Sequence, residues 1–268
     1  MSKIGTLIVV LFVGAFAGVT SAAAASSAPP GYSQKEVDFS IAPGSYVVPG
    51  TVSCSSGVVW GGGTGDLTPV FGEGFVSSLP SGTSWFAQYD NQSTATRNWA
   101  VYVICAKKPA GYKHVFKGAN NPNNALTTAT VTCPTGTVVY SGGVQSPADG
   151  FGSAVPSLGP ANKTTFRASV FNGTGTDQHL TVWAVCGQQP PKYRIVAVPS
   201  SGGGNAFYID AACPTGTALI GGGVIQTGTL SHTVVIGAST DVGQAWQGRV
   251  LNPGGGSISL SVRAVCAA

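Results

Sequence analysis

The chain has 268 residues, of which 8% are charged and 43% are hydrophobic, and its formal net charge is +4 at pH 7. An ordinary hydrophobic fraction with so little charge excludes a disordered chain. No Lys/Arg cluster exceeds Lys107-Lys108, which excludes a nucleic-acid-binding surface. The 39 Gly and 17 Pro residues, together with much Thr, Ser and Val, indicate an all-β extracellular protein with many tight turns.

The N-terminal segment predicts a secretory signal peptide. Lys3 forms a short basic region, residues 4–19 are uncharged and mostly apolar, and residues 20–25 offer small-residue cleavage sites. The apolar run is short for a membrane anchor, which needs about 20 residues, and no basic stop-transfer segment follows it. We therefore expect a signal peptide over residues 1–25, a secreted extracellular protein, and no membrane span after cleavage.

The rest of the chain repeats one unit of about 80 residues three times. The first cysteines of the three pairs recur at an almost constant interval, and the second cysteines recur at nearly the same interval. In an exported chain, an even number of cysteines predicts disulfides rather than metal thiolates. The repeat selects one pairing, which is Cys54–Cys105, Cys133–Cys186 and Cys213–Cys266. We expect β-repeats over residues 26–108, 109–189 and 190–268.

Each repeat begins with a proline-rich joint and a tyrosine, which is Tyr32, Tyr112 or Tyr193. A turn motif follows, Cys-Pro-Thr-Gly-Thr at Cys133 and Cys213 and a degraded form at Cys54, before a short β-branched strand and a glycine cluster. Such glycines permit a bulge or a close approach of another backbone. We expect five or six short strands in each repeat and almost no helix.

The second half of each repeat contains a strand that opens on an aromatic residue and closes on Asn, and the last cysteine follows that Asn at the same distance in every copy. This fixed spacing predicts a hairpin of fixed register. The opening aromatics are aligned in all three copies, which indicates core packing; they are Trp85, Phe166 and Trp246. Another aligned set contains an Ile, which also points to packing; it is Trp60, Tyr140 and Ile220.

The strand that ends at the last cysteine alternates with period two, and its cysteine face is small and apolar in every copy. That face is expected to face the core. The opposite face carries Tyr102, Trp183 and Arg263 at one equivalent position. These three residues are the ligand-binding candidates. Tyr102 and Trp183 are the best of them, because outward aromatics flanked by polar side chains hold sugar rings and peptide surfaces in shallow sites. In the alternative interpretation, Tyr102 and Trp183 cover the interface between repeats.

The pattern C-P-x-G, a β-branched stretch, G-G-G, the aromatic-to-Asn strand and the closing V-x-A-x-C resembles the repeat units of secreted actinobacterial proteins of unknown function, over residues 29–268. The C-P-x-G opening and the threefold repetition are also similar to vitelline-membrane-outer-layer proteins. Those proteins have a β-prism fold with pseudo-threefold symmetry, so this second resemblance implies a β-prism and, by analogy, carbohydrate binding.

Two architectures fit these observations. In the first, three four-stranded sheets surround a pseudo-threefold axis and share one core, as in a β-prism. In the second, three disulfide-stapled β-sandwiches follow one another in tandem. The short joints, such as the one between Cys105 and Tyr112, favour the first arrangement.

The sequence contains no evident catalytic constellation. The three histidines lie at unrelated places in the repeat, and none of the nine acidic residues is matched in all three copies. We therefore expect no catalytic residue, no metal site and no cofactor, although distant loops could assemble a carboxylate pair for a hydrolase.

We expect a secreted, non-enzymatic binding module that recognises carbohydrate or another cell-envelope component multivalently. The alternatives are a structural or protective envelope protein and an inhibitor of another secreted protein. An inhibitor would use the longest expected loops, residues 64–78 and 145–160.

Overall fold

The computed structural model describes residues 27–66, 73–146, 152–202, 206–231, 234–252 and 254–268. The predicted signal peptide lies outside these ranges. No helix in the part of the chain that the structure describes is long and apolar enough to cross a membrane.

Each repeat contributes six strands. The first repeat forms β1 (Ser33–Ile41), β2 (Ser45–Ser53), β3 (Val58–Asp66), β4 (Glu73–Ser81), β5 (Ser84–Asn91) and β6 (Arg97–Ala106). The second forms β7 (Lys113–Asn121), β8 (Ala125–Thr132), β9 (Thr137–Gln145), β10 (Ser153–Pro160), β11 (Thr165–Asn172) and β12 (Gln178–Gln188). The third forms β13 (Arg194–Gly202), β14 (Ala206–Ala212), β15 (Ala218–Gln226), β16 (Val235–Val242), β17 (Ala245–Leu251) and β18 (Ile258–Ala267).

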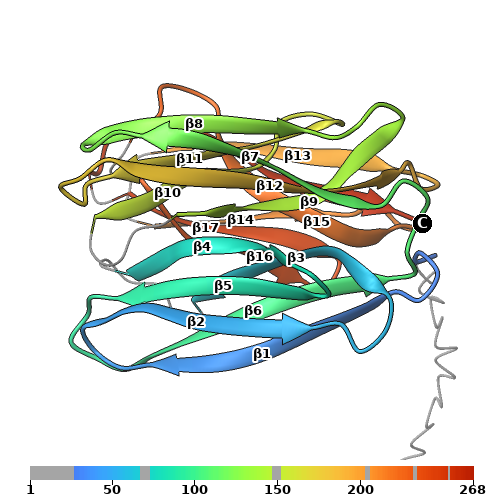
Figure 1. The fold of residues 1–268 in the computed structure, drawn as a ribbon, viewed down its shortest axis with the longest axis horizontal. Coiled ribbons are helices and arrows are strands. Elements are labelled where there is room, and N and C mark those ends of the chain that lie inside the picture. Colours follow the sequence, from blue (N-terminus) through green and yellow to red (C-terminus); the bar gives the residue numbers. More distant parts are fainter. Residues whose placement is uncertain (1–26, 67–72, 147–151, 203–205, 232–233, 253) are drawn as a thin grey trace, which may run out of the picture.

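The strands form three antiparallel six-stranded sheets (Figure 1). Their strand orders are β1-β6-β3-β16-β17-β14 for sheet A, β2-β5-β4-β9-β12-β7 for sheet B, and β13-β18-β15-β10-β11-β8 for sheet C. The pseudo-threefold all-β fold is confirmed, whereas the expectation of four-stranded sheets is wrong. The expectation of long loops for an inhibitor is also wrong in large part, because β4 and β10 occupy residues 73–81 and 153–160. Residues 67–72 and 147–151 lie outside the described residues.

Every sheet is shared between two repeats. The first, sixth and third strands of one repeat pair with each other, and the fourth, fifth and second strands of another repeat continue the same sheet. The first repeat extends the sheet of the second, the second extends that of the third, and the third extends that of the first. Three separate sandwiches in tandem are therefore excluded.

The last glycine of each cluster permits this exchange. Gly63, Gly143 and Gly223 lie where β3, β9 and β15 meet a strand of another repeat. A Cβ atom added to Gly143 would stand 2.0 Å from the Ser78 carbonyl oxygen, and one on Gly63 would stand 2.1 Å from that of Ser239. Only a residue without a side chain lets the two backbones approach this closely.

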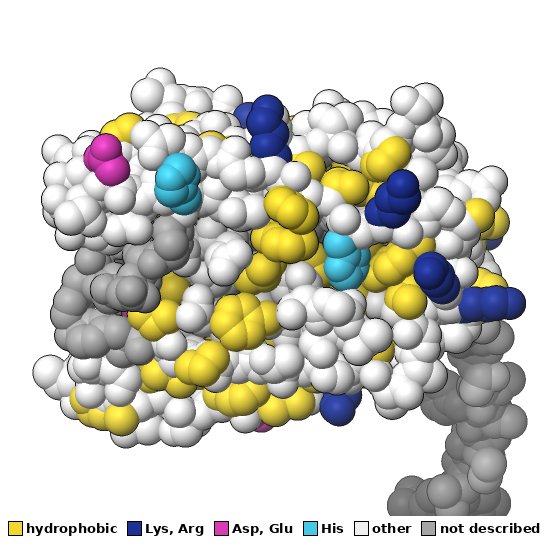
Figure 2. Space-filling view, in the orientation of Figure 1, with side chains coloured by type: hydrophobic (Ala, Val, Ile, Leu, Met, Phe, Trp, Pro, Cys, Tyr) yellow, Lys and Arg dark blue, Asp and Glu magenta, His cyan; other side chains and the backbone are white. Residues whose placement is uncertain are grey.

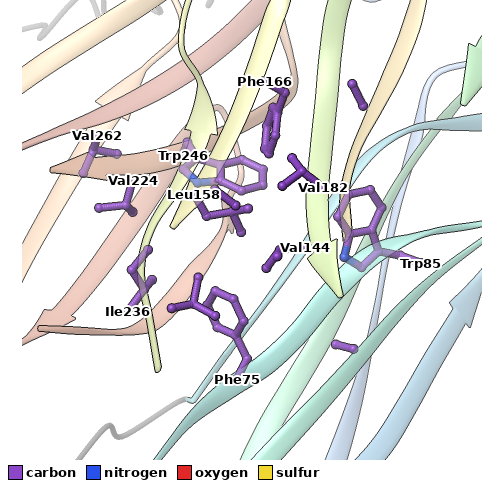
Figure 3. Packing of buried hydrophobic residues seen from close by; sticks show 14 of the residues in the cluster. Phe75, Trp85, Val144, Leu158, Phe166, Val182, Val224, Ile236, Trp246 and Val262 are labelled. Carbon is purple, nitrogen blue, oxygen red and sulfur yellow. The ribbon is translucent and has the colours of Figure 1, made fainter. Parts of the chain in front are cut away.

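The aligned aromatics lie in one hydrophobic core that all three repeats share, as predicted (Figure 3). Trp85, Phe166 and Trp246 are at most 2% exposed. The middle glycine of each cluster makes room for a ring, since a Cβ atom on Gly62 would meet the Trp85 indole at 2.4 Å. The core aromatics and the glycine clusters are therefore complementary parts of one packing arrangement.

A second, smaller cluster contains Trp60, Tyr140 and Ile220, which confirms that this aligned set packs together. The rings of Trp60 and Tyr140 lie 4.5 Å apart between centroids. The tyrosine that opens each repeat joins this cluster and donates a hydrogen bond to a carbonyl of a different repeat. The pairs are Tyr32 to Leu219 at 2.7 Å, Tyr112 to Val59 at 2.8 Å and Tyr193 to Val139 at 2.7 Å.

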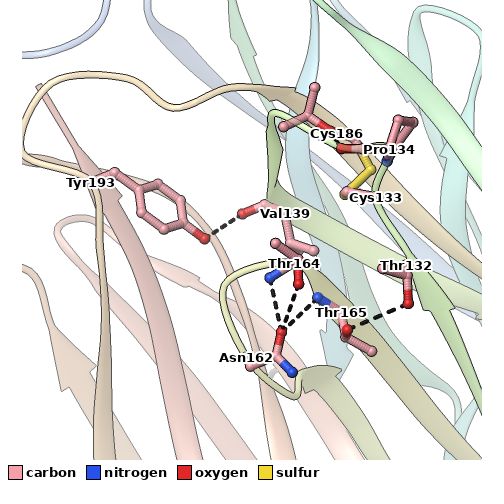
Figure 4. Close-up of a disulfide and its surroundings, with 10 residues drawn as sticks. Thr132, Cys133, Pro134, Val139, Asn162, Thr164, Thr165, Cys186 and Tyr193 are labelled. Atoms are coloured by element: carbon pink, nitrogen blue, oxygen red, sulfur yellow. Dashed lines mark hydrogen bonds between the residues drawn. A yellow bond between two sulfur atoms is a disulfide. The ribbon is translucent and has the colours of Figure 1, made fainter.

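The three disulfides have the predicted pairing, and no described cysteine is free. Figure 4 shows the Cys133–Cys186 bridge beside the hydrogen bond from Tyr193 to Val139. Cys133 follows β8 of sheet C, whereas Cys186 lies in β12 of sheet B. The bridge therefore ties two sheets together, and the other two bridges do the same for the remaining pairs of sheets.

Candidate functional site

The three sequence-predicted binding residues occupy equivalent positions on three different sheets. Tyr102, Trp183 and Arg263 each lie opposite the last glycine of a cluster, in β6, β12 and β18. Their neighbours along the strand are fully buried in the core, so the candidates lie on the outer faces, where they are half-buried. The structure does not bring them together, and whether they bind a ligand stays a prediction.

Each candidate belongs to a row of side chains that crosses the outer face of its sheet at the same level. The polar row on sheet A consists of Glu36, Tyr102, Gly63, Thr240, Gln247 and Asp210. The aromatic row on sheet B consists of Phe116, Trp183, Gly143, Leu79, Phe86 and Thr51. The basic row on sheet C consists of Ala197, Arg263, Gly223, Gly159, Arg167 and Thr130.

Each row crosses the seam between two repeats, because each sheet contains strands of two repeats. The glycine at the seam has no side chain, so the outer surface is depressed there. Large side chains on either side lean over it. Arg263 of the third repeat, for example, donates to the carbonyl oxygens of Pro160 and Ala161 of the second, at 2.6 and 2.7 Å. Arg263 therefore lies on the outer surface and also contacts another repeat, and Tyr102 lines a pocket with Asp241 of the third repeat. For Trp183 the two interpretations stay predictions.

The aromatic row is the most apolar of the three. Phe116 is 63% exposed, the largest value among the described large hydrophobic residues. Its ring centroid lies 4.7 Å from that of Trp183, at an interplanar angle of 36°. Leu79 is only 6% exposed and fills the space beside Gly143, and Phe86 continues the row as its register partner. Figure 2 shows hydrophobic side chains gathered across the middle of the face that sheet B presents.

Polar side chains flank the aromatic row. Thr181, Gln145 and Gln88 lie two residues further along β12, β9 and β5 on the same face. On the other side, His114 precedes Phe116 on β7, and its Nε2 shares a 2.7 Å hydrogen bond with the Tyr112 hydroxyl. Burial lowers the pKa of His114, so its imidazole is neutral at pH 7. The aromatic row thus carries no charged side chain and is bordered by neutral hydrogen-bonding groups.

The polar row lies beside a pocket of about 340 Å³, and the pocket contains a pair of carboxylates. Glu36 comes from β1 of the first repeat and Asp241 from β16 of the third, and Tyr102 lies with them. Burial, and to a lesser degree the Glu36 charge, raises the pKa of Asp241 to about 6. The pKa of Tyr102 is raised by burial first and by Glu36 second. With a pKa of about 6, the carboxylic acid of Asp241 can donate a proton near neutral pH.

Sequence reasoning missed Glu36, Asp241, Phe116, Phe86 and Arg167. Phe86 and Arg167 directly follow aligned core aromatics, so the period-two argument could have placed them on the outer face. No sequence signal pairs Glu36 with Asp241, because the two acids belong to different repeats and unmatched positions. In the described ranges, no group of three or more His, Cys, Asp or Glu side chains could hold a metal ion.

Comparison of the chain with models of known protein families found no match, and comparison with curated proteins found none either. The resemblances of the repeat unit stay predictions. The function of the protein is therefore inferred from its own surface residues.

Proposed function

We propose that the protein is an extracellular, non-enzymatic binding module that holds a polysaccharide on the aromatic row of sheet B. One observation carries this proposal: Phe116, Trp183 and Phe86 lie in register across the outer face of a single sheet. The three disulfides suit an oxidising extracellular compartment, which agrees with the predicted signal peptide over residues 1–25.

Sugar rings match the chemistry of this row. A sugar presents an apolar C–H face, which packs on aromatic rings, and a rim of hydroxyl groups, which pair with the flanking Thr181, Gln145 and Gln88. The row extends from β7 to β5, which are four strand spacings apart, or about 19 Å. This length suits several rings of an extended polymer better than a single sugar.

A second protein is a poorer fit than a polysaccharide. With a width of two residues along the strand, the row covers about 130 Å². A stable protein–protein interface buries about 800 Å² on each partner. The polar residues that border the row prevent the apolar surface from extending toward that size.

The three rows differ in chemistry, so we propose one carbohydrate site instead of three equal ones. The positions of Trp183 and Phe86 are taken by Tyr102 and Gln247 on sheet A and by Arg263 and Arg167 on sheet C. Avidity would then require several copies of the protein, because one molecule presents a single aromatic row.

Co-sedimentation of the mature protein with insoluble cellulose, chitin and isolated peptidoglycan tests the proposal. Trp183→Ala and Phe116→Ala are each expected to weaken retention roughly tenfold, which corresponds to about 1.4 kcal/mol of stacking and apolar contact. Tyr208→Ala is the matched control, because Tyr208 is 59% exposed on β14 of sheet A. Retention that is unchanged in Trp183→Ala, or no retention of the wild type on any of the three, would contradict the proposal.

A second candidate is glycoside hydrolysis, which the Glu36–Asp241 pair favours. Two carboxylates in one pocket, of which Asp241 has a raised pKa, are the groups that such a reaction uses. Release of reducing sugar from soluble polysaccharides by the wild type, and its loss in Glu36→Gln, would establish this activity. If the wild type releases no sugar from polymers that it binds, the candidate is eliminated.

A further inference from the structure

The basic row of sheet C places two arginines against each other. Arg263 lies in β18 of the third repeat and Arg167 in β11 of the second, and only Gly223 and Gly159 separate them in the row. Three strand spacings, or about 14 Å, separate their backbones. Because neither glycine has a side chain, both arginines extend over the floor between them, and a pocket of about 200 Å³ lies beside Ala161, Ile225 and Thr227.

Each guanidinium group is held by main-chain carbonyl oxygens of the opposite repeat. Arg263 Nη1 donates to Pro160 and Ala161, at 2.6 and 2.7 Å, and Arg167 Nη2 donates to the Gln226 carbonyl at 2.7 Å. The arginines thus reach past each other in opposite directions. These contacts hold both groups at the pocket before any ligand arrives.

The other terminal nitrogens remain available. Among the described residues, Arg263 Nη2 and Arg167 Nη1 have no acceptor, and neither belongs to the buried polar atoms without a partner. Both side chains line the pocket, and the Nε atoms of both arginines are buried without a hydrogen-bond partner. A guanidinium group carries five N–H donors, so each arginine keeps donors for an external acceptor.

In the described strands of this sheet, no carboxylate balances the two charges. None of the six strands of sheet C contains Asp or Glu, whereas the strands of sheet A contain Glu36, Asp38, Asp66, Asp210 and Asp241. Burial, followed by the charge of Arg167, lowers the pKa of Arg263, which places the two groups within electrostatic reach of each other. Two like charges held together at a half-buried site raise the free energy of the empty protein, and a bound anion removes this cost.

We propose that Arg167 and Arg263 form a binding site for one oxyanion group, a sulfate, phosphate or carboxylate, of an anionic extracellular polymer. Each arginine offers one terminal nitrogen, so the two guanidinium groups together can donate charge-assisted hydrogen bonds to one such oxyanion. The pocket has room for one such group together with a few waters, each of which occupies about 30 Å³ in the liquid. The site is independent of the aromatic row, since the two lie on different sheets.

Side-chain NMR of the arginine Nε–Hε groups tests the site directly. Sodium sulfate and sodium phosphate are titrated against sodium chloride of equal ionic strength. We expect saturable shifts of the Arg167 and Arg263 signals and no saturable shift of Arg194, which is exposed at the start of β13 in the same sheet. Shifts that grow linearly or equally for all three arginines would overturn the proposal.

Substitutions separate the site from general attraction to positive charge. Arg167→Gln and Arg263→Gln are each expected to lower sulfate affinity roughly tenfold, whereas Arg194→Gln, with the same change of net charge, leaves it unchanged. If Arg263→Gln fails to fold after losing its bonds to the backbone, Arg263→Lys retains the positive charge and a donor for the Pro160 and Ala161 carbonyls and removes the second terminal nitrogen. Unchanged affinity in both Arg167→Gln and Arg263→Lys would also overturn the site.

Polymer probes identify the source of the oxyanion. The protein is passed over immobilised dextran sulfate, polygalacturonate and uncharged dextran. Retention by one charged polymer that is lost in Arg167→Gln assigns its sulfate or carboxylate as the ligand. Binding of the inorganic ions without retention on either charged polymer would refute the proposal that the oxyanion belongs to a polymer, and the site would then be assigned to a free ion. Retention on uncharged polysaccharide tests the aromatic row instead, so the two proposals fail separately.

Discussion

Asp241→Asn should make the protein more stable at neutral pH and leave its stability almost unchanged in acid. Asp241 is only 7% exposed, and burial with Glu36 nearby raises the pKa of its carboxyl from 3.8 to about 6. The folded state therefore binds this proton more tightly than the unfolded state does. The stabilisation from that proton is complete below the unfolded pKa and is lost as the pH rises through the folded pKa.

The size of the effect follows from the same shift. Each pKa unit corresponds to about 1.4 kcal/mol, so the ionised carboxylate costs about 3 kcal/mol above pH 6, as an order of magnitude. Asparagine has no charge to bury and avoids this cost. The free energy of unfolding of the variant minus that of the wild type should be near zero below about pH 4, rise between about pH 4 and 6, and then remain constant.

Thermal unfolding at several pH values between 4 and 8, with the disulfides intact, measures this difference. At pH 8 the Tm of Asp241→Asn should exceed that of the wild type by about 6 to 12 °C for a protein of this size. Asp38→Asn is the matched control, because Asp38 is exposed on β1 of the same sheet. A difference that does not change with pH, or a variant less stable than the wild type at pH 8, would refute the reasoning.

Two further predictions concern the exchange of strands between repeats. Gly143→Val should destabilise the protein by about 3 kcal/mol or more, because its Cβ would stand 2.0 Å from the Ser78 carbonyl oxygen at the seam between β9 and β4. Gly118→Val, whose Cβ would meet nothing closer than 3.9 Å, should cost much less, and equal losses in the two variants would argue against a close seam. Removal of the Cys133–Cys186 bridge by two Ala substitutions should cost about 4 kcal/mol, since the two cysteines are separated by 53 residues of sequence. Calorimetry of that variant should show one cooperative transition because every sheet contains strands of two repeats, and separate transitions for the repeats would contradict the shared sheets.

Much of each repeat could be predicted from its own residues. The cysteine spacing identified the three bridges, because the two cysteines of one copy are separated by 51, 53 and 53 residues in the three copies. The alternation along β6, β12 and β18 placed Tyr102, Trp183 and Arg263 on the outer faces, because side chains of a strand point alternately to its two faces. The aligned Trp85, Phe166 and Trp246 indicated the core, because a large aromatic side chain at the same position of every copy must pack into an equivalent buried space.

The partners of each strand could not be predicted in this way. The glycine-rich strands β3, β9 and β15 predict that another backbone lies close to them. The pattern does not say whether that backbone is the fourth strand of the same repeat or of another repeat. The wrong expectation of four-stranded sheets has this origin. The arginine pair and the carboxylate pair were missed for the same reason, since each pair joins residues of different repeats.

The amino-acid sequence by itself determined the repeat, the disulfide pairing, the strand faces and the aromatic core, all of which depend on spacing and alternation within one copy. Only the tertiary structure decided which copies share a sheet, and hence that Phe116, Trp183 and Phe86 form one row while Arg263 meets Arg167. Backbone hydrogen bonds between strands are the same whichever copy supplies the strand. The choice between copies therefore depends on how all three repeats close around a common core.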